Sequence, residues 1–246
     1  MRHASSVDNV FELRQYRLHP GARETLITVF DREFLETQEE ADIRVVAQFR
    51  DLDDTDSFVW LRSFADMEAR REALGRFYNG PTWARHRDAA NGTMVNSDNV
   101  LLLRPASFDP TFQLPATERP RSGSTLESSA LFLCSIYYAA PGKEEAFSAF
   151  FENELRLPLL ESGATIPATF LSEHSANTFP RLPIREGESV FVALYRFATP
   201  QAYATHLGAL AASRKWTETI QPQIMQRTWR ETEVLRLSPT SRSLMR

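Results

Sequence analysis

The chain has 246 residues, of which 42% are hydrophobic and 24% are charged, and its formal net charge is −4. This composition is typical of a globular protein and gives no indication of a nucleic-acid-binding surface. The single cysteine, Cys134, excludes an intramolecular disulfide bond and a multi-cysteine metal site. Apolar runs are too short to span a membrane and residues 1–9 lack a signal-peptide core, so we expect a cytoplasmic location. Only Lys143 and Lys215 are lysines among the 28 basic residues, a bias that indicates a GC-rich bacterial genome.

The first half of the chain alternates between strand-like and helix-like patterns. Its strand-like segments have apolar residues in alternation or in short runs between turn residues: 10–18, 43–50, 57–64 and 100–103. Two segments have helical spacing: 24–39, and a stretch that runs through Met67, Arg71, Leu74 and Phe77 and restarts at Pro81. The resulting order, βαββαβ, predicts a ferredoxin-like domain with an antiparallel sheet and both helices on one face.

A proline-rich segment separates the two halves. Prolines recur at positions 105, 110, 115 and 120, and the segment ends in a run rich in serine and glycine. Such a sequence continues neither a helix nor a central strand, so residues 107–128 are predicted to be a linker. Phe108, Phe112 and Leu114 are expected to hold this linker against one domain face.

The second half repeats the order of strands and helices of the first. Matching segments occur in the same order in both halves. The pairs are Pro20-Gly21 with Pro141-Gly142, 58–64 with 191–197, Trp83 with Trp216, and 100–105 with 234–239. The repeat is too long for a solenoid unit, so we predict two tandem ferredoxin-like domains, residues 8–106 and 129–239. An insertion over residues 174–188 distinguishes the second half, and its prolines suit either a binding loop or a packed surface loop.

Several segments of the first half resemble the NIPSNAP family. The resemblance rests on four stretches: FELRQY (11–16), FADMEARREAL (64–74), TWA (82–84) and NVLLLRP (99–105). It covers essentially all of the first half and is weaker in the second. It implies the dimeric α+β barrel fold, in which two ferredoxin-like sheets pack face to face, and a tandem chain would supply both sheets as an intramolecular dimer. The family has no single activity, so the resemblance implies a fold and leaves the reaction open.

Strand alternation in the first half separates an apolar set from a charged set. We expect the apolar set to face the helices: Phe11, Leu13, Val45, Ala47, Phe49, Val59, Leu61, Leu101 and Leu103. The opposite set contains Glu12, Arg14 and Arg62 and is expected to face the partner sheet, where buried charges must be paired. The second half has neutral residues at the equivalent places: Leu133, Ser135 and Tyr195.

The charged set is the candidate catalytic centre. Arg14 and Arg62 would present positive charge to an anionic or enolate-like group, with Glu12 as acid, base or orienting partner. The same residues also suit a salt-bridge network that only fixes the docking of the two sheets. His86 is added as a candidate general base, although it also suits an ordinary solvated histidine on a helix.

The candidate substrate-binding residues are Tyr16, Trp60, Trp83, Tyr195 and His206. They suit a pocket for a flat hydrophobic molecule, and they equally suit a packed core. His206 is also the candidate ligand if the protein binds haem. No two histidines have the spacing of metal ligands, so we expect no metal site. The sequence lacks glycine-rich nucleotide-binding motifs and the motifs of catalytic nucleophiles, so we also expect no cofactor.

The predicted function is a cofactor-independent enzyme of oxygenase, isomerase or dehydratase type that acts on a hydrophobic aromatic or polyketide-like small molecule. The alternative is a non-catalytic module that binds a small molecule, haem or a protein. We expect neither a nucleic-acid nor a membrane partner. A homodimer in addition to the internal pseudo-dimer is left open.

Overall fold

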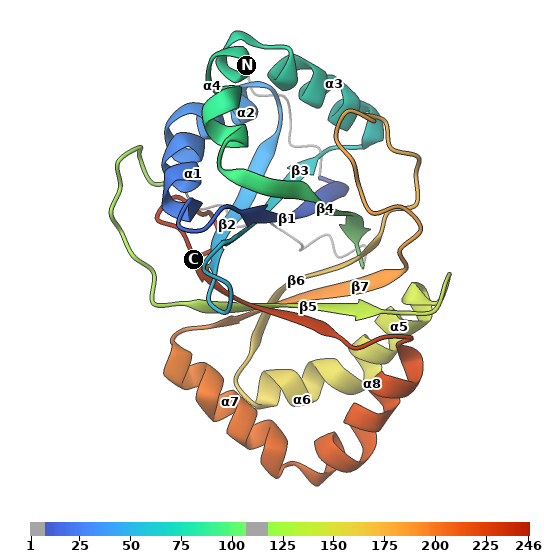
Figure 1. The fold of residues 1–246 in the computed structure, drawn as a ribbon. Helices are drawn as coiled ribbons and strands as arrows, with labels where there is room; N and C mark the ends of the chain where they lie inside the picture. Colours follow the sequence, from blue (N-terminus) through green and yellow to red (C-terminus); the bar gives the residue numbers. More distant parts are fainter. Residues whose placement is uncertain (1–7, 107–117) are drawn as a thin grey trace.

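The computed structural model describes residues 8–106 and 118–246. In these residues eight antiparallel strands close into one barrel, in the order β1-β3-β2-β8-β5-β7-β6-β4 (Figure 1). The first half contributes β1 (Val10–Leu18), β2 (Arg44–Asp51), β3 (Ser57–Phe64) and β4 (Met94–Pro105). The second half contributes β5 (Leu131–Tyr138), β6 (Thr165–Ser172), β7 (Val190–Phe197) and β8 (Glu233–Pro239). The strands of each half are neighbours, and short pairings of β2 with β8 and of β4 with β6 join the halves.

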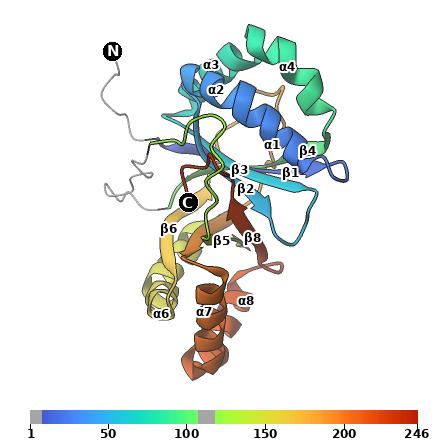
Figure 2. The same ribbon diagram turned by 90° about the vertical axis from the view of Figure 1, so that its left-hand side faces the viewer.

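Helices cover the barrel in two layers, one from each half of the chain (Figures 1 and 2). The first layer consists of α1 (Arg23–Val29), the π-helical segment η1 (Phe30–Phe34), α2 (Leu35–Glu40), α3 (Met67–Tyr78) and α4 (Pro81–Asn91). The second consists of α5 (Glu144–Phe150), η2 (Phe151–Leu155), α6 (Arg156–Glu161), α7 (Pro200–Ala212), η3 (Trp216–Ile220) and α8 (Gln221–Arg227). The fold is therefore α+β, as predicted. Within the described ranges no helix has both the length and the apolar character needed to cross a bilayer.

Local signals explain where these elements begin. Gly21 and Gly142 follow the first strand of each half with φ of 75° and 70°, a conformation that residues with a Cβ rarely adopt. The side chains of Asp66 and Thr199 cap α3 and α7 by accepting backbone hydrogen bonds, and Pro81 opens α4. Strand β4 starts six residues before the predicted segment 100–103, because its first residues pair with the end of β1.

The barrel interior is filled by apolar side chains from both halves. The rings of Phe11 and Phe170 lie 4.9 Å apart, and those of Phe49 and Phe132 lie 5.2 Å apart. Apart from Val45, the whole apolar set that was predicted to face the helices lies in this interior. The prediction about the two faces of the first sheet is therefore wrong.

The charged set of the first half lies under the helices instead of against the second sheet. Val10, Tyr16 and Trp60, which share its face of the sheet, pack with the helical residues in a separate core. The physical reason is that both faces of each sheet are buried, one by the barrel and one by helices. The alternation of side chains along a strand separates the two sets, but it does not show which set faces the helices and which faces the barrel interior.

Residues 107–117 of the predicted linker, with Phe108, Phe112 and Leu114, lie outside the described residues. In the part that follows, Arg119 donates to the main-chain oxygen of Arg242 at 2.7 Å. Residues 240–246 pack against the barrel, with Met245 in its core. The segment that follows β8 is therefore part of the folded barrel.

Candidate functional site

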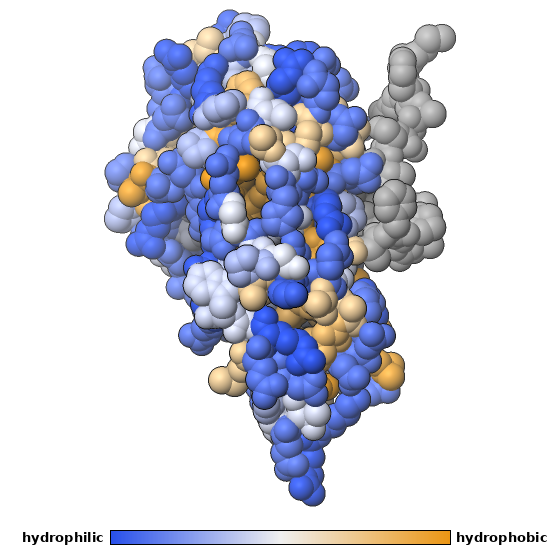
Figure 3. All heavy atoms as spheres, turned by 90° about the vertical axis from the view of Figure 1, so that its right-hand side faces the viewer, coloured by the Kyte–Doolittle hydropathy of each residue, from blue (hydrophilic) through white to orange (hydrophobic). Residues whose placement is uncertain are grey.

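A cavity of about 410 Å³ lies between the helices of the first half and the outer face of β1 and β3. Aromatic side chains make much of its wall: Tyr16, Phe30, Phe34, Trp60, Phe77, Tyr78 and Trp83. Polar groups stand among them: Arg14, Gln38, Arg87, Asp88, Asn91, Ser97 and Arg181. Seen from one side, the molecule has a hollow with hydrophobic residues at its base in the upper half, on a largely hydrophilic face (Figure 3). The volume suits a small-molecule ligand.

The aromatic wall is held by ring-to-ring contacts. Trp60 meets Phe30 edge to face at 4.9 Å and Tyr16 at 5.9 Å. On the opposite side, Trp83 contacts Tyr78 in the same way at 4.8 Å. Interlocked rings of this kind resist rearrangement, so the cavity offers flat apolar surfaces in defined positions.

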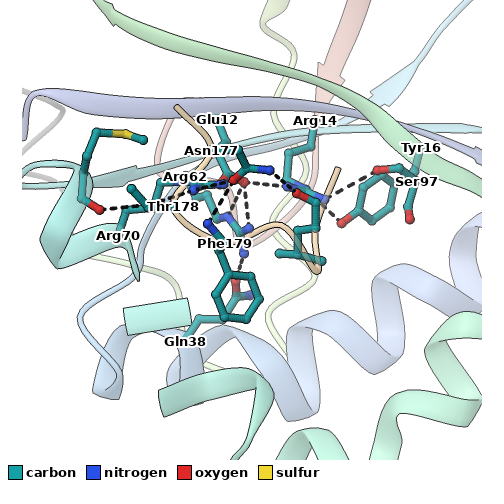
Figure 4. Close-up of polar contacts among 12 residues, drawn as sticks. Glu12, Arg14, Tyr16, Gln38, Arg62, Arg70, Ser97, Asn177, Thr178 and Phe179 are labelled. Carbon is teal, nitrogen blue, oxygen red and sulfur yellow. Dashed lines mark hydrogen bonds and ion pairs between the residues drawn. The ribbon is translucent and has the colours of Figure 1, made fainter. Parts of the chain in front are cut away.

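Beside the cavity, one buried carboxylate binds three guanidinium groups (Figure 4). Glu12 Oε2 accepts from Arg14 Nη1 at 2.5 Å and from Arg62 Nε at 2.8 Å, and its Oε1 accepts from Arg70 Nε at 2.7 Å. All four side chains are at most 1% exposed. Arg62 also donates to Gln38 Oε1 at 3.4 Å. We call Glu12, Arg14, Arg62 and Arg70 the arginine cluster.

The electrostatics of the arginine cluster decide what Glu12 can do. Burial alone would raise the pKa of Glu12, but the guanidiniums of Arg62, Arg14 and Arg70 outweigh it and hold that pKa well below its usual range. A carboxylate that stays ionised at every physiological pH is a poor general acid, and its engaged oxygens make it a poor base. Glu12 therefore orients the arginines, which was one of the three roles considered from the sequence.

Arg14 connects the arginine cluster to the cavity, because it belongs to the cluster and lines the cavity. Its Nε donates to the hydroxyl of Tyr16 at 3.0 Å, and its guanidinium lies 5.6 Å from the ring centre of Trp60. Burial raises the pKa of Tyr16 despite the opposing effect of Arg14, so this hydroxyl keeps its proton. Having accepted from Arg14, the hydroxyl can donate that proton to a ligand.

The loop of residues 174–188 covers this region from the second half of the chain. Arg70 Nη1 donates to Asn177 Oδ1 at 3.1 Å and to Thr178 Oγ1 at 3.2 Å, and Thr178 Oγ1 donates to the main-chain oxygen of Met67 at 3.1 Å. Arg181 lines the cavity and binds the end of α3. Both halves of the chain therefore build the site.

The structure brings together six of the nine predicted site residues. Glu12, Arg14 and Arg62 form the cluster, and the side chains that line the cavity beside it include Tyr16, Trp60 and Trp83.

The remaining three lie elsewhere. His86 lies on α4 with its Nε2 3.3 Å from Glu33 Oε2, and it is not among the cavity-lining residues. Tyr195 packs under the helices of the second half and shares a hydroxyl contact of 3.1 Å with Tyr137. His206 lies on α7, with its ring 4.8 Å from that of Phe197.

Strand register shows how the second half differs at this place. Glu12 is paired with Arg62 across β1 and β3, and Leu133 is paired with Tyr195 across β5 and β7. Counted from the capping residues of α3 and α7, Arg70 corresponds to Tyr203. The charges of the arginine cluster are thus replaced by uncharged side chains, and Leu133 and Tyr195 belong to the apolar core of the second half.

Sequence reasoning missed Arg70, Gln38 and the cavity-lining phenylalanines. The signal for Arg70 was present, since Arg70, Leu74 and Phe77 share the buried face of α3 while Arg71 points to solvent. Gln38 had no comparable signal, because a polar residue near a helix end is usually exposed.

The fold and the site together define an α+β barrel with an aromatic cavity under one of its two helical layers. Residues 11–110 match the NIPSNAP family, which confirms the resemblance that the sequence of the first half indicated. No curated protein matches the chain significantly. Among the described residues, no group of three or more His, Cys, Asp or Glu side chains is arranged to hold a metal ion.

Solved structures of similar length share the fold. The "Putative monooxygenase" of Fusobacterium nucleatum is 10% identical, with a TM-score of 0.57 over 96% of this chain and 94% of that one. The "putative monooxygenase" of Lactobacillus acidophilus is 12% identical, with a TM-score of 0.54 over 95% and 94%. An "anthrone oxidase-like protein" is 9% identical, with a TM-score of 0.53 over 94% and 91%. At such identities the likeness concerns the fold alone.

Proposed function

We propose that the first-half cavity is the active site of a cofactor-independent enzyme that acts on a flat aromatic or polyketide-like small molecule. One observation carries this proposal: an aromatic cavity of about 410 Å³ ends on Arg14, a buried arginine whose neighbour Tyr16 keeps a proton to donate. The names of the full-length structural neighbours, monooxygenase and anthrone oxidase-like, are compatible with it.

Oxygenases, isomerases and dehydratases that need no cofactor can begin with the same step. A C–H bond next to a carbonyl group breaks, its proton passes to a base, and the electron pair moves onto the carbonyl oxygen as an enolate or, in an aromatic ring system, a phenolate. Among the residues that line the cavity, the Asp88 carboxylate would accept this proton. Arg14 and the Tyr16 hydroxyl would stabilise that oxygen, and the low polarity of the aromatic wall would strengthen the interaction. Glu12 would hold Arg14 in place without exchanging a proton.

We also propose that the two halves are ferredoxin-like repeats in which only the first keeps the site. The strand order within each half and the matching registers of β1 with β3 and of β5 with β7 support this proposal. The second copy would then serve as the scaffold that closes the barrel and supplies the loop of residues 174–188.

The proposal is tested by ligand binding and turnover in a variant with Trp216→Phe and Trp229→Phe, which keeps only Trp60 and Trp83 of the four tryptophans. Titration with anthrone and with naphthols should quench the fluorescence of the two remaining indoles. Oxygen uptake or a change in substrate absorbance then reports catalysis.

Trp83→Ala should weaken binding by about tenfold through loss of a stacking surface, while Trp216→Phe alone should not weaken it. Binding without any turnover of the panel would favour the non-catalytic alternative. Absence of binding by every flat aromatic probe would refute the proposed site.

A further inference from the structure

The arginine cluster holds more positive than negative charge. Three guanidiniums surround one carboxylate, and among the described residues Glu12 is the only carboxylate that pairs with any of them. The other partners of Arg14, Arg62 and Arg70 are neutral groups: Tyr16, Gln38, Ser97, Asn177 and Thr178. Uncompensated charge in a buried site is costly, and proteins keep it where a ligand balances it.

The groups around Arg14 also offer donors in excess of acceptors. Trp60 lines the cavity, and its buried Nε1 has no hydrogen-bond partner among the described residues. Gln38 uses its Oε1 to accept from Arg62, which leaves the amide Nε2 as a donor in a residue that lines the cavity. The Tyr16 hydroxyl accepts from Arg14 and so keeps its hydrogen for another acceptor. A buried indole N–H without an acceptor is energetically costly, and a ligand that supplies an acceptor would remove this cost.

We infer that the natural ligand of this cavity is an aromatic monoanion, a carboxylate or phenolate already ionised when it binds, whose charged oxygen lies against Arg14. The inference rests on the proposed function and adds the charge of the ligand to it. An ionised oxygen supplies an acceptor for Arg14, Trp60 Nε1 and Gln38 Nε2, and one negative charge reduces the excess of the arginine cluster from two to one.

The second half provides an internal comparison. Its counterparts of Glu12, Arg14 and Arg62 are Leu133, Ser135 and Tyr195, of which Leu133 and Tyr195 belong to an apolar core under its helices. The excess charge therefore occurs in the half whose helices cover the cavity, and the corresponding positions of the other half lack it. A purely structural ion-pair network would have no need of an adjoining cavity.

The experiment compares two probes of equal size and shape, 2-naphthoate and its neutral isostere 2-naphthamide, by tryptophan fluorescence or calorimetry on the full chain. The wild-type protein should bind the carboxylate about tenfold to 100-fold more tightly than the amide. Arg14→Gln should abolish most of this preference and leave the affinity for the amide nearly unchanged. Since Arg14→Gln disturbs a buried network, Trp60→Phe serves as a second variant that removes only one donor and should reduce the preference about threefold to tenfold.

Arg87→Gln is the matched control for general attraction, because Arg87 lines the cavity but is about half exposed. Arg87→Gln should preserve most of the preference for naphthoate over naphthamide and reduce the salt dependence of that preference. Equal binding of the two probes by the wild-type protein would overturn the inference and leave the proposed function standing. Loss of the preference in Arg87→Gln but not in Trp60→Phe would also overturn it. Failure of naphthoate, naphthamide and neutral naphthols alike to bind would refute the proposed function as well.

Discussion

Arg62 lies directly opposite Glu12 across β1 and β3, and its Nε lies 2.8 Å from the carboxylate. The pair at the same register in the second half is Leu133 and Tyr195. Corresponding strand positions therefore hold a buried ion pair in the first half and two uncharged side chains in the second. This difference allows the contribution of the arginine cluster to stability to be measured separately from its role in binding.

We predict that Glu12→Gln destabilises the protein by about 3 to 5 kcal/mol, because three buried guanidiniums lose their common counter-charge. The free energy of unfolding in urea measures this loss. Glu145→Gln is the matched control, since the Glu145 carboxylate pairs with Arg104 at an exposed site and should cost less than about 1 kcal/mol. Equal losses in the two variants would contradict the central role of Glu12.

Replacing the whole arginine cluster should cost less than replacing Glu12 alone. The variant with Glu12→Leu, Arg14→Ser, Arg62→Tyr and Arg70→Tyr takes the residues of the second half and leaves no buried charge without a partner. We predict cooperative unfolding with a midpoint above that of Glu12→Gln, and no binding of aromatic anions. A quadruple variant less stable than Glu12→Gln would show that the cluster is needed for folding itself.

The loop of residues 174–188 should loosen when its contact with α3 is removed. Thr178→Val removes the hydrogen bond to the main-chain oxygen of Met67 and one acceptor of Arg70, at a cost of about 1 kcal/mol. We predict faster trypsin cleavage after Arg181 and faster ligand dissociation. Ser175→Ala, at an exposed position of the same loop, should change neither rate. Equal cleavage rates in the two variants would show that Thr178 does not anchor the loop.

Asp31 should make stability fall as the pH rises from about 4 to about 6. Burial raises the pKa of Asp31 from 3.8 to about 6, so the folded protein binds a proton that the unfolded chain has lost in this window. Asp31→Asn should therefore stabilise the protein at about pH 8 by roughly 1 to 2 kcal/mol, allowing for partial exposure, and should have little effect at about pH 4. Unfolding curves at both pH values, with the exposed Glu40→Gln as control, measure the difference. A constant effect of Asp31→Asn across this range would contradict the assignment.

Much of the fold was predictable because its signals are local. The strands of residues 10–18 and 57–64 have apolar patterns between clear turn residues, so their predicted bounds agree with β1 and β3. The start of β4 and the π-helical segments η1 and η2 were not predictable in this way. The start of β4 depends on pairing with the end of β1, which is distant in the sequence.

The candidate site was predictable only in part. Glu12, Arg14 and Arg62 were found because they interrupt an apolar strand pattern, and Trp60 and Tyr16 because they are aromatic on the same face. Arg70 joins them from a helix, and the loop of residues 174–188 reaches them from the other half of the chain.

The sequence by itself determined the order of strands and helices, the two sets of side chains on each strand, and the restriction of the charged set to one half. Only the tertiary structure decided that the charged set faces helices, that Arg70 completes the arginine cluster, and that an aromatic cavity adjoins it. The physical reason is that alternation records which residues share a face, whereas barrel closure buries both faces. Which layer covers each face, and how completely it fills the space, depends on packing between elements that are far apart in the sequence.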